Sequence, residues 1–381
     1  MKIGFDISQT GDNKAGCGYL AYSLIRALAE IDTQNEYLLY PTFGDFYFDP
    51  NWPRTVVKLK QRNFHQWPGQ SALKEARAFW GNPPVDFEKQ IGEPQIVQAN
   101  NFYCPIGIKS ARLVYLLYDL GFLWDPNTTP EANRIGCFSG VFRASLYADH
   151  IVAISNFSRD HFLRVFPQFP ADRVTVIPLA SRFKIEGEVS KPASLRHLET
   201  DRFWLNVGTL EPRKNQLRLL SAYARLKAEM GSTYPLVFAG GKGWLVENFD
   251  KVTVDLGLEA DVIRLGYVDD QQLAWLYRNC YAFIYPTLFE GFGLPVLEAM
   301  SLGAAVITSN TTSVPEVVGD AGLLVDPYKP EEIFSAMYAL ASNPTERDRL
   351  RALALQRAQQ FSWQRTAKQF LELYTRLNAG R

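Results

Sequence analysis

The sequence lacks the residues and spacings that usually hold metal ions. It has four cysteines, Cys17, Cys104, Cys137 and Cys280, and none is paired with another at the short spacing typical of zinc or redox sites. We expect reduced thiols, as in a cytoplasmic protein. The sequence also has only four histidines, no Asp-x-Asp motif and no cluster of His or Cys, so we predict no metal site.

An excess charge of one sign and long apolar runs are missing as well. Lys and Arg together number 40, and so do Asp and Glu, so the whole chain has no positive excess that would favour nucleic acid. No apolar run approaches the roughly 20 residues that cross a bilayer. The first residues, MKIGFDISQT, are typical of a buried strand and not of a signal peptide. We expect a cytoplasmic protein that at most contacts the inner face of the cytoplasmic membrane peripherally.

The length of 381 residues and the hydrophobic content of 47% predict two domains, each with its own core. Strand-like apolar runs alternate with amphipathic helical stretches along the chain. The runs are KIGF, RLVYLLY, HIVAIS, RVTVIP, FWLNVG, PLVFAG, DVIRLG, CYAFIYP and AAVITS. This alternation predicts an α/β fold in which helices cover both faces of parallel sheets.

Residues 181–200 interrupt the alternation with polar, proline-containing sequence. We therefore expect an N-terminal domain over 1–185, a linker over 186–200 and a C-terminal domain over 201–360. Residues 361–381 have apolar side chains at helical spacing, which predicts a closing amphipathic helix.

Residues 41–90 are less regular and rich in aromatic side chains. These are Phe43, Phe46, Tyr47, Phe48, Trp52, Phe64, Trp67, Phe79 and Trp80. Aromatic residues usually fill cores, so our first interpretation is that they pack an irregular insertion of the first domain. The second is an acceptor-facing or membrane-facing surface. The sequence alone leaves both interpretations open.

The segment LFEGFGLPVLEAM predicts an anion site. It follows the run CYAFIYP, so it lies at the carboxyl end of a strand, where parallel sheets bind ligands. A helix that starts near Phe292, Gly293 and Leu294 would offer free N–H groups to a phosphate. Glu298, about one turn into this helix, could accept hydrogen bonds from a ribose. Glu290, which precedes the turn, would face the other end of the same ligand.

The segment VGTLEPRKNQ predicts the other half of the anion site. Arg213 and Lys214 stand at the start of a helix, where the helix dipole disfavours cations. A bound diphosphate would account for both of them. We therefore predict that these two side chains and the helix N-termini supply preorganised positive charge where negative charge develops in a reaction.

Together these segments resemble family 4 retaining glycosyltransferases, which have the GT-B fold. EGFGLPVLE matches the E-x7-E motif of the family, VGTLEPRKN its phosphate-binding segment, and LGYVDDQQLAWLY and SVPEVVGDAGLLVDP two further blocks. AGCGYLAYSLIRAL resembles the glycine-rich loop that opens a helix in the first domain. The resemblance covers nearly the whole chain. It implies two Rossmann-like parallel-sheet domains facing across a cleft, with the C-terminal helix crossing back to the first domain.

The resemblance also implies roles for particular residues. Glu290, Arg213 and Lys214 would be catalytic: the two cations would hold the diphosphate, and Glu290 would orient the transferred sugar and stabilise its oxocarbenium-like state. Glu298 would bind the ribose of the donor. The residues implied to contact the donor are Gly16, Gly18, Tyr118, Asp119, Gly208, Thr209, Val268, Phe292, Gly293, Leu294 and Glu298.

Two residues depart from the pattern of the family. Thr209 stands where the family often has arginine, so Arg213 and Lys214 would carry more of the positive charge. Tyr118, which precedes Asp119 in YLLYDLGF, stands where the family frequently has histidine. A tyrosine can donate a hydrogen bond but cannot become a cation, so the donor-sugar contact of that histidine does not carry over directly.

The resulting prediction is a metal-independent retaining hexosyltransferase. Its donor would be a UDP-hexose such as UDP-glucose, or GDP-mannose, and the sequence does not distinguish the two. The acceptor would be a hydroxyl of a glycan or lipid-linked glycan of bacterial polysaccharide synthesis. Two alternatives use the same nucleotide pocket: a UDP-sugar epimerase of GT-B fold, and a non-catalytic nucleotide-sugar-binding protein.

Overall fold

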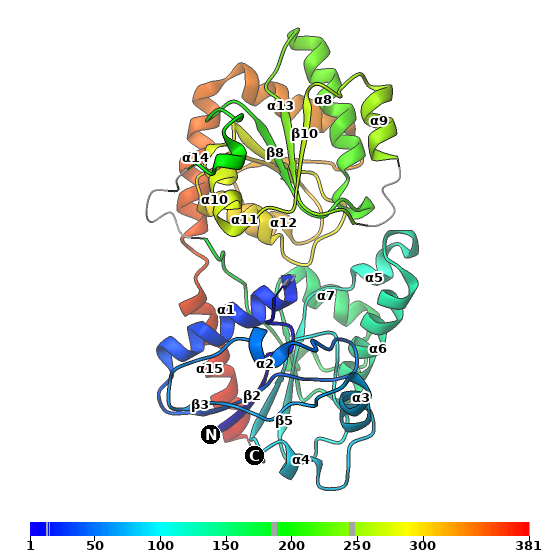
Figure 1. Cartoon of the computed structure of the whole chain (residues 1–381), viewed down its shortest axis with the longest axis vertical. Coiled ribbons are helices and arrows are strands. Elements are labelled where there is room, and N and C mark those ends of the chain that lie inside the picture. Colours follow the sequence, from blue (N-terminus) through cyan, green and yellow to red (C-terminus); the bar gives the residue numbers. More distant parts are fainter. Residues whose placement is uncertain (13, 15, 184–188, 190, 244–247, 381) are drawn as a thin grey trace. The chain divides into compact units, whose positions relative to one another are not determined.

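The computed structural model describes residues 1–12, 14, 16–183, 189, 191–243 and 248–380 (Figure 1). The chain folds into two compact units, each with its own parallel sheet. Unit 1 comprises Met1–Pro126, Glu131–Leu179 and Ser362–Arg381, and unit 2 comprises Asn127–Pro130 and Ala180–Phe361. The predicted α/β fold with two parallel-sheet domains is confirmed.

A seven-stranded sheet forms the centre of unit 1. Its strands are β1 (Lys2–Asp6), β2 (Glu36–Tyr40), β3 (Phe64–Gln66), β4 (Ile96–Ala99), β5 (Arg112–Leu117), β6 (His150–Ala153) and β7 (Val174–Val176). They are parallel and follow the order β3-β2-β1-β4-β5-β6-β7. Every residue of β4 and β6 is buried, because helices and loops cover both faces of the sheet.

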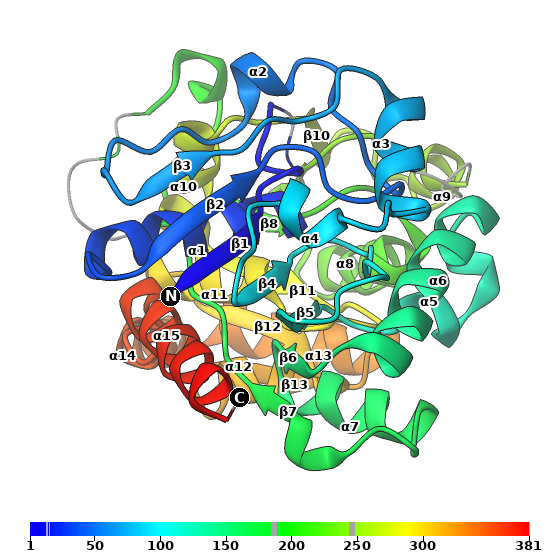
Figure 2. The ribbon, with the colours of Figure 1, turned by 90° about the horizontal axis from the view of Figure 1, so that it is seen from below.

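Helices connect these strands and cover the sheet of unit 1. They are α1 (Gly16–Ile31), α2 (Trp52–Thr55), α3 (Leu73–Gly81), α4 (Phe87–Gln90), α5 (Gly121–Trp124), α6 (Glu131–Tyr147), α7 (Asn156–Val165) and α15 (Trp363–Ala379), with the short 3-10 turns η1 (Pro126–Thr128) and η2 (Ala171–Arg173). The last helix, α15, packs beside α1 (Figures 1 and 2). Its Tyr374 hydroxyl donates to Gln98 of β4 over 2.9 Å. The predicted C-terminal helix thus returns to the first domain.

The aromatic side chains of residues 41–90 mainly fill the core of unit 1. Phe43 and Trp80 are buried, and their ring centroids lie 4.4 Å apart. Phe87 packs on Trp80 with the rings nearly perpendicular. Tyr47, by contrast, is 36% exposed. The packing interpretation therefore holds for Phe43, Phe64 and Trp80, which are all buried.

A six-stranded parallel sheet forms the centre of unit 2. Its strands are β8 (Trp204–Val207), β9 (Leu236–Ala239), β10 (Val262–Gly266), β11 (Ala282–Tyr285), β12 (Val306–Ser309) and β13 (Leu323–Val325), in the order β10-β9-β8-β11-β12-β13. Its helices are α8 (Gln216–Met230), α9 (Phe249–Asp255), α10 (Asp270–Asn279), α11 (Leu294–Ser301), α12 (Val314–Val318), α13 (Pro330–Ser342) and α14 (Pro344–Ala358), with the 3-10 turns η3 (Ala193–Leu195) and η4 (Pro212–Lys214). The strands β8 and β11 are neighbours, so their carboxyl ends meet at one edge of the sheet.

The boundary between the units lies earlier than the predicted linker. Besides Asn127–Pro130, unit 2 comprises the chain from Ala180 to Phe361, and Arg182 of this segment makes an ion pair with Glu298 of α11. After the gap, Leu195 and Leu198 are buried, so this part of the expected linker is packed and not extended. Residues 184–188 and 190 of the expected boundary lie outside the described residues.

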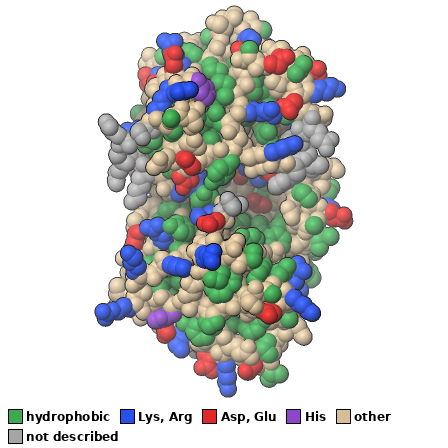
Figure 3. Space-filling model, viewed as in Figure 1, with side chains coloured by type: hydrophobic (Ala, Val, Ile, Leu, Met, Phe, Trp, Pro, Cys, Tyr) green, Lys and Arg blue, Asp and Glu red, His purple; other side chains and the backbone are tan. Residues whose placement is uncertain are grey.

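Charged side chains of both signs are interspersed over the face of the molecule shown in Figure 3. This mixture matches the balanced composition of the sequence. Among the described residues, no helix is both long and apolar enough to cross a membrane.

Candidate active site

The turn η4, which follows β8, carries Arg213 and Lys214. Asn215 ends the turn in the left-handed region, with φ 62°, and α8 begins at the next residue. Its side-chain amide donates to the carbonyl oxygens of Pro286 (2.8 Å) and Pro327 (2.7 Å). These hydrogen bonds fix η4 against the loops after β11 and β13, so both cations project from a backbone that is held at a defined position.

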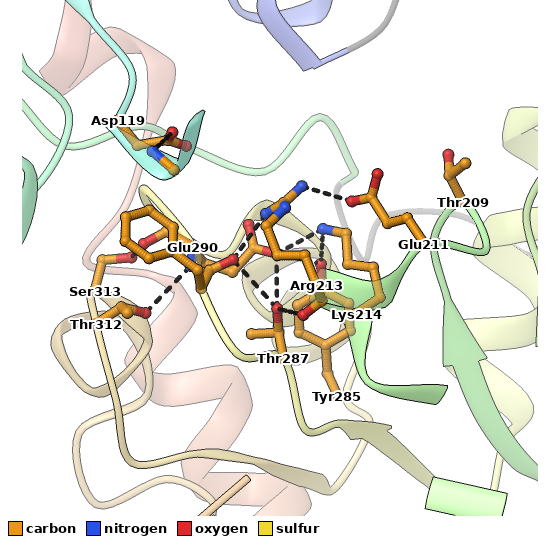
Figure 4. A network of polar contacts seen from close by, with 12 residues as sticks. Asp119, Thr209, Glu211, Arg213, Lys214, Tyr285, Thr287, Glu290, Thr312 and Ser313 are labelled. Atoms are coloured by element: carbon orange, nitrogen blue, oxygen red, sulfur yellow. Dashed lines mark hydrogen bonds and ion pairs between the residues drawn. The ribbon is translucent and has the colours of Figure 1, made fainter. Parts of the chain in front are cut away.

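Four side chains converge on one oxygen of Glu290, in the loop after β11 (Figure 4). Its Oε1 lies 2.5 Å from Lys214 Nζ and 3.0 Å from Arg213 Nη1. It also accepts hydrogen bonds from the Tyr285 hydroxyl (2.8 Å) and from Thr287 Oγ1 (3.2 Å). The sequence predicted that Glu290 and the two cations belong to one site, and the structure brings them into direct contact.

A second carboxylate balances the charge of this cluster. Glu211 Oε1 lies 2.7 Å from Arg213 Nη2, and Glu211 is buried. Two cations and two carboxylates therefore stand together at the carboxyl ends of β8 and β11. A diphosphate bound here would share Arg213 and Lys214 with carboxylates that already contact them.

The ionisation states in this cluster follow from burial and pairing. Burial alone would raise the pKa of Glu290, but Lys214 and Arg213 outweigh it and lower the pKa to about 2. Burial, together with the charge of Arg213, lowers the pKa of Lys214. Burial, followed by the charge of Glu290, raises the pKa of Tyr285 well above its usual value, so its hydroxyl keeps the proton that it donates.

The loop after Glu290 turns into α11 at Gly293. Gly293 has φ +100°, a conformation that favours glycine, and it is the N-cap residue of α11. Its carbonyl accepts from the N–H groups of Val296 (3.0 Å) and Leu297 (3.1 Å). The first N–H groups of the helix, at Gly293 and Leu294, lie at the predicted position for binding a phosphate. The ring of Phe292 packs edge-on against Phe361, with the ring centroids 6.0 Å apart.

Glu298 lies one turn into α11 in an environment unlike that of Glu290. Its Oε1 lies 3.0 Å from Arg182 Nε, and its Oε2 accepts from the Tyr277 hydroxyl over 3.3 Å. Burial raises the pKa of Glu298 to about 7, although Arg182 opposes this shift. The pKa values of the two glutamates of the motif are therefore shifted in opposite directions. Glu290 is ionised throughout the neutral range, whereas Glu298 titrates within it.

The other donor-binding predictions in unit 2 fall at the same edge of the sheet. Gly208 follows β8 directly with φ +144°, and Thr209 comes next, with its carbonyl accepting from Gln216 over 3.1 Å. Val268 is half-buried between β10 and α10. The roles of these three residues in donor binding stay predictions.

The remaining predicted donor contacts belong to unit 1. Gly16 is the first residue of α1 and Gly18 is buried in its first turn. Tyr118 and Asp119 follow β5, and the Asp119 carboxylate accepts from the Gly121 N–H over 2.7 Å. The predicted donor site thus consists of two groups of residues, one in each unit.

Tyr118 has a clear structural role within unit 1. It is 7% exposed, and its hydroxyl donates to the Asn100 carbonyl over 2.5 Å. The same hydroxyl lies 3.4 Å from the Cys17 carbonyl, in the first turn of α1. Tyr118 therefore ties the start of α1 to the end of β4, a role for which no positive charge is needed.

The chain matches a known family over its C-terminal half. Residues 190–357 match the model described as "Glycosyl transferases group 1". The chain is also 36% identical over 285 residues to the O-antigen chain mannosyltransferase B of Escherichia coli, an alignment that covers 73% of this chain and 74% of that protein. The chain belongs to the group 1 glycosyl transferases. The resemblance stated from its motifs is thereby confirmed.

Two further comparisons describe this glycosyltransferase. It is 34% identical over 273 residues to the serotype-specific mannosyltransferase WbdA of Escherichia coli, and the alignment covers 70% of this chain but only 32% of WbdA. Its fold superposes on the sucrose-phosphate synthase of Thermosynechococcus elongatus with a TM-score of 0.76 at 19% identity, over 100% of both chains. The latter likeness supports the GT-B fold.

Sequence reasoning missed several residues that complete the site of this glycosyltransferase. Tyr285 and Thr287 contact Glu290 from the end of β11 and the loop after it, and Arg182 contacts Glu298. The only available signal for Tyr285 was its position at the carboxyl end of a strand next to the motif. For Arg182 the sequence offers no local signal, because its partner lies on a helix more than a hundred residues away.

Gly16 and Gly18 of α1 allow a matched test of the predicted contact between the glycine-rich loop and the donor. A Cβ added at Gly18 would overlap the Gln9 carbonyl, whereas one at Gly16 would meet no described atom within 4 Å. We expect Gly18→Ala to destabilise unit 1 by about 1–3 kcal/mol, measured by thermal unfolding. Gly16→Ala is expected to keep the wild-type melting temperature but to slow sugar transfer. Full activity of Gly16→Ala would contradict the predicted donor contact.

Proposed function

We propose that this glycosyltransferase moves a mannosyl residue from GDP-mannose to a hydroxyl of a glycan or lipid-linked glycan, with retention of the anomeric configuration and without a metal ion. The observation that carries the proposal is the convergence of Lys214, Arg213 and Tyr285 on Glu290 Oε1. This cluster stands beside the start of α11, where a phosphate would bind.

The reaction requires positive charge where the leaving group gains negative charge. The bond between the sugar C1 and the β-phosphate oxygen breaks, and its electron pair stays on that oxygen. Arg213, Lys214 and the N–H groups at the start of α11 would stabilise this charge as preorganised donors. Two side-chain cations already at the site supply what a divalent ion would otherwise contribute, which supports the metal-independent form of the proposal.

The acceptor oxygen would form its bond to C1 on the face from which the diphosphate departs. The acceptor proton passes to the departing phosphate oxygen, so charge and protons balance without an enzyme base. The low pKa of Glu290, about 2, favours this route, because such a carboxylate is a weak base and a weak nucleophile. Glu290 would instead orient the sugar and stabilise the positive charge that develops on its ring.

The choice of mannose rests on the relatives of the chain. Both Escherichia coli proteins described above are named as mannosyltransferases, and one of them as an O-antigen chain enzyme. We therefore favour GDP-mannose over UDP-glucose, and a growing surface polysaccharide as the acceptor.

A binding and hydrolysis experiment tests the donor. We expect GDP and GDP-mannose to raise the melting temperature of the full-length protein more than UDP and UDP-glucose do. With GDP-mannose, slow release of GDP and free mannose is expected, and NMR of a transfer product should show the α-configuration of the donor. Added EDTA should leave the rate unchanged.

Each alternative gives a different result in the same experiment. Tight donor binding without any turnover would indicate a non-catalytic nucleotide-sugar-binding protein. A new nucleotide sugar or a free epimerised sugar, formed without an acceptor, would indicate an epimerase. A preference for UDP-glucose would overturn the donor but keep the transferase, and loss of activity in EDTA would overturn the metal-independent form.

A further inference from the structure

Arg182 joins the segment that enters unit 2 to the second glutamate of the motif. It lies outside any helix or strand, and its side chain is 19% exposed. Its Nε lies 3.0 Å from Glu298 Oε1, and its Nη1 lies 3.2 Å from Asp270 Oδ1 at the start of α10. One guanidinium group thus bridges two helices of unit 2 and touches a carboxylate of the predicted nucleotide site.

Aromatic contacts hold Arg182 in this position. The guanidinium carbon lies 4.8 Å from the centre of the Phe183 ring. The Phe183 ring in turn packs edge-on against Tyr277, with ring centroids 6.2 Å apart. Tyr277 donates its hydroxyl to the other oxygen of Glu298, Oε2. Both oxygens of Glu298 are therefore contacted by groups that pack on one another, which fixes the plane of the carboxylate.

From this arrangement we propose that Arg182 is a positioning residue for Glu298: it holds the carboxylate as an ion, in the plane in which it accepts hydrogen bonds from both ribose hydroxyls of the donor. The inference rests on the proposed function, which assigns the ribose to Glu298. An ionised carboxylate offers about four lone-pair positions. Tyr277 uses one of them on Oε2, and the guanidinium of Arg182 lies beside Oε1 as an ion pair. Each oxygen can therefore accept from one of two neighbouring hydroxyls.

The charge state of Glu298 depends on the groups that face it. These are Arg182 from the entering segment, and Asp270 and Tyr277 from α10. Burial raises the pKa of Glu298 to about 7, Arg182 and Tyr277 lower it, and Asp270 raises it. Without Arg182 the buried carboxylate would lose its counter-ion and take up a proton at neutral pH. A protonated Glu298 would hold the ribose less well.

The competing explanation is that Arg182 only anchors the entering segment to unit 2. The two explanations differ in which ligands should respond. An anchor would affect every nucleotide equally, whereas a positioning residue should affect only the ligands that carry ribose hydroxyls. GDP and 2',3'-dideoxy-GDP differ in these hydroxyls alone. The ratio of their dissociation constants also cancels the titration of the phosphates and of the base.

The test is calorimetric titration of the full-length protein with both nucleotides between about pH 6 and 9. The wild type should prefer GDP, with a preference that grows as pH rises through about 7 and then levels off, because Glu298 becomes ionised. Arg182→Gln should weaken GDP binding about tenfold at neutral pH and leave dideoxy-GDP unchanged. Its preference for GDP should still be rising at about pH 9.

Two further variants separate charge from anchoring. Arg182→Lys keeps the positive charge but not the planar fork, so it should retain the wild-type pH profile with a smaller loss of affinity. Asp270→Asn removes the other anchor of Arg182 and leaves the contact with Glu298. It also removes a charge that raises the pKa of Glu298, so it should bind GDP at least as well as the wild type does, with the pH profile moved to lower pH. Melting temperatures of all variants show whether each one is folded.

The outcomes distinguish this inference from the proposed function. Equal weakening of GDP and dideoxy-GDP in Arg182→Gln would overturn the positioning role. The positioning role would also be overturned if Glu298→Gln abolished the preference for GDP over dideoxy-GDP but Arg182→Gln left this preference intact. If the wild type bound neither GDP nor UDP, the proposed function itself would fail. If it bound UDP and not GDP, the same comparison would be made with UDP and 2',3'-dideoxy-UDP.

Discussion

Replacing Glu290 with glutamine is expected to lower kcat for sugar transfer by about 10²–10³-fold, while GDP binds as well as before or better. The substitution keeps the size of the side chain but removes the negative charge on which Lys214 and Arg213 converge. Both cations then become more available to the diphosphate, so binding is maintained. The transferred sugar, however, loses the carboxylate that stabilises its positive charge, so only the chemical step suffers.

When the cation Lys214 is removed, we expect GDP binding to suffer as well as kcat. Lys214→Met leaves Glu290 ionised beside the diphosphate, so it should weaken GDP binding and lower kcat together. Steady-state kinetics with GDP-mannose, and calorimetry with GDP, measure the two effects separately. Because the pKa of Glu290 is about 2, protonation of this residue should not lower the activity of the wild type between about pH 5 and 9. Lys214→Met removes the charge that lowers this pKa most, so the pKa of Glu290 should rise in the variant.

Glu211→Gln is the matched control for the Glu290 variant. It removes the same charge from the same cluster, since Glu211 pairs with Arg213 over 2.7 Å. In our proposal, however, Glu211 does not touch the sugar, so its loss should slow transfer by less than about tenfold. If Glu211→Gln and Glu290→Gln slowed transfer equally, the charge balance of the cluster would explain both effects, and the role of Glu290 at the sugar would fall.

The sequence predicts the local structure around this candidate site well where the signal is local. The spacing of Glu290 and Glu298 around Gly293 correctly locates the start of α11, because a glycine with positive φ and a following proline leave few other structures for that turn. Arg213 and Lys214 were predicted as an anion clamp from the same kind of local reasoning. The structure adds that they are already paired with carboxylates.

The contacts that the sequence did not predict are those between distant segments. Tyr285 could be recognised as a strand residue but not as a donor to Glu290. The hydroxyl of Tyr118 donates to the backbone carbonyl of Asn100. This contact could not be predicted by noting that the family frequently has histidine at the position of Tyr118. Arg182 stands in a stretch that we expected to belong to the first domain. Such partners are chosen by packing in three dimensions, and no periodicity or spacing encodes them.

Some strands of the fold were also not predicted from the sequence. The long apolar runs were identified as strands, but β3 and β13, three residues each, are too short to show a pattern. The strand β4 includes the buried Gln98, whose polar side chain breaks the apolar run and accepts from Tyr374 of α15. These three strands are therefore hard to identify from their own sequence, whereas β2 (EYLLY) has an apolar run that we did not identify.

Asn215 is expected to be the residue of the site whose loss most reduces stability. Asn215→Ala leaves the Pro286 and Pro327 carbonyls without the amide that donates to both. Each lost hydrogen bond to a buried acceptor lowers the free energy of unfolding by about 1–3 kcal/mol. Alanine in the left-handed conformation lowers it by about 1 kcal/mol more than asparagine or glycine does. We expect unit 2 to lose about 3–7 kcal/mol. Hydrogen exchange of the β8 and β11 amides measures this loss in unit 2 alone.

Asn215→Gly separates the two contributions and links them to catalysis. Glycine relieves the backbone at φ 62° but restores neither hydrogen bond, so it should recover only about 1 kcal/mol of the loss. Because Lys214 precedes Asn215 in the turn, the loosened turn should also slow transfer, by about 10²-fold for a shift of about 1 Å. A glycine variant as stable and as active as the wild type would show that the turn holds its cations without Asn215. Slow transfer in a well-folded glycine variant would instead show that the rigidity of η4, and not only its charge, sets the rate.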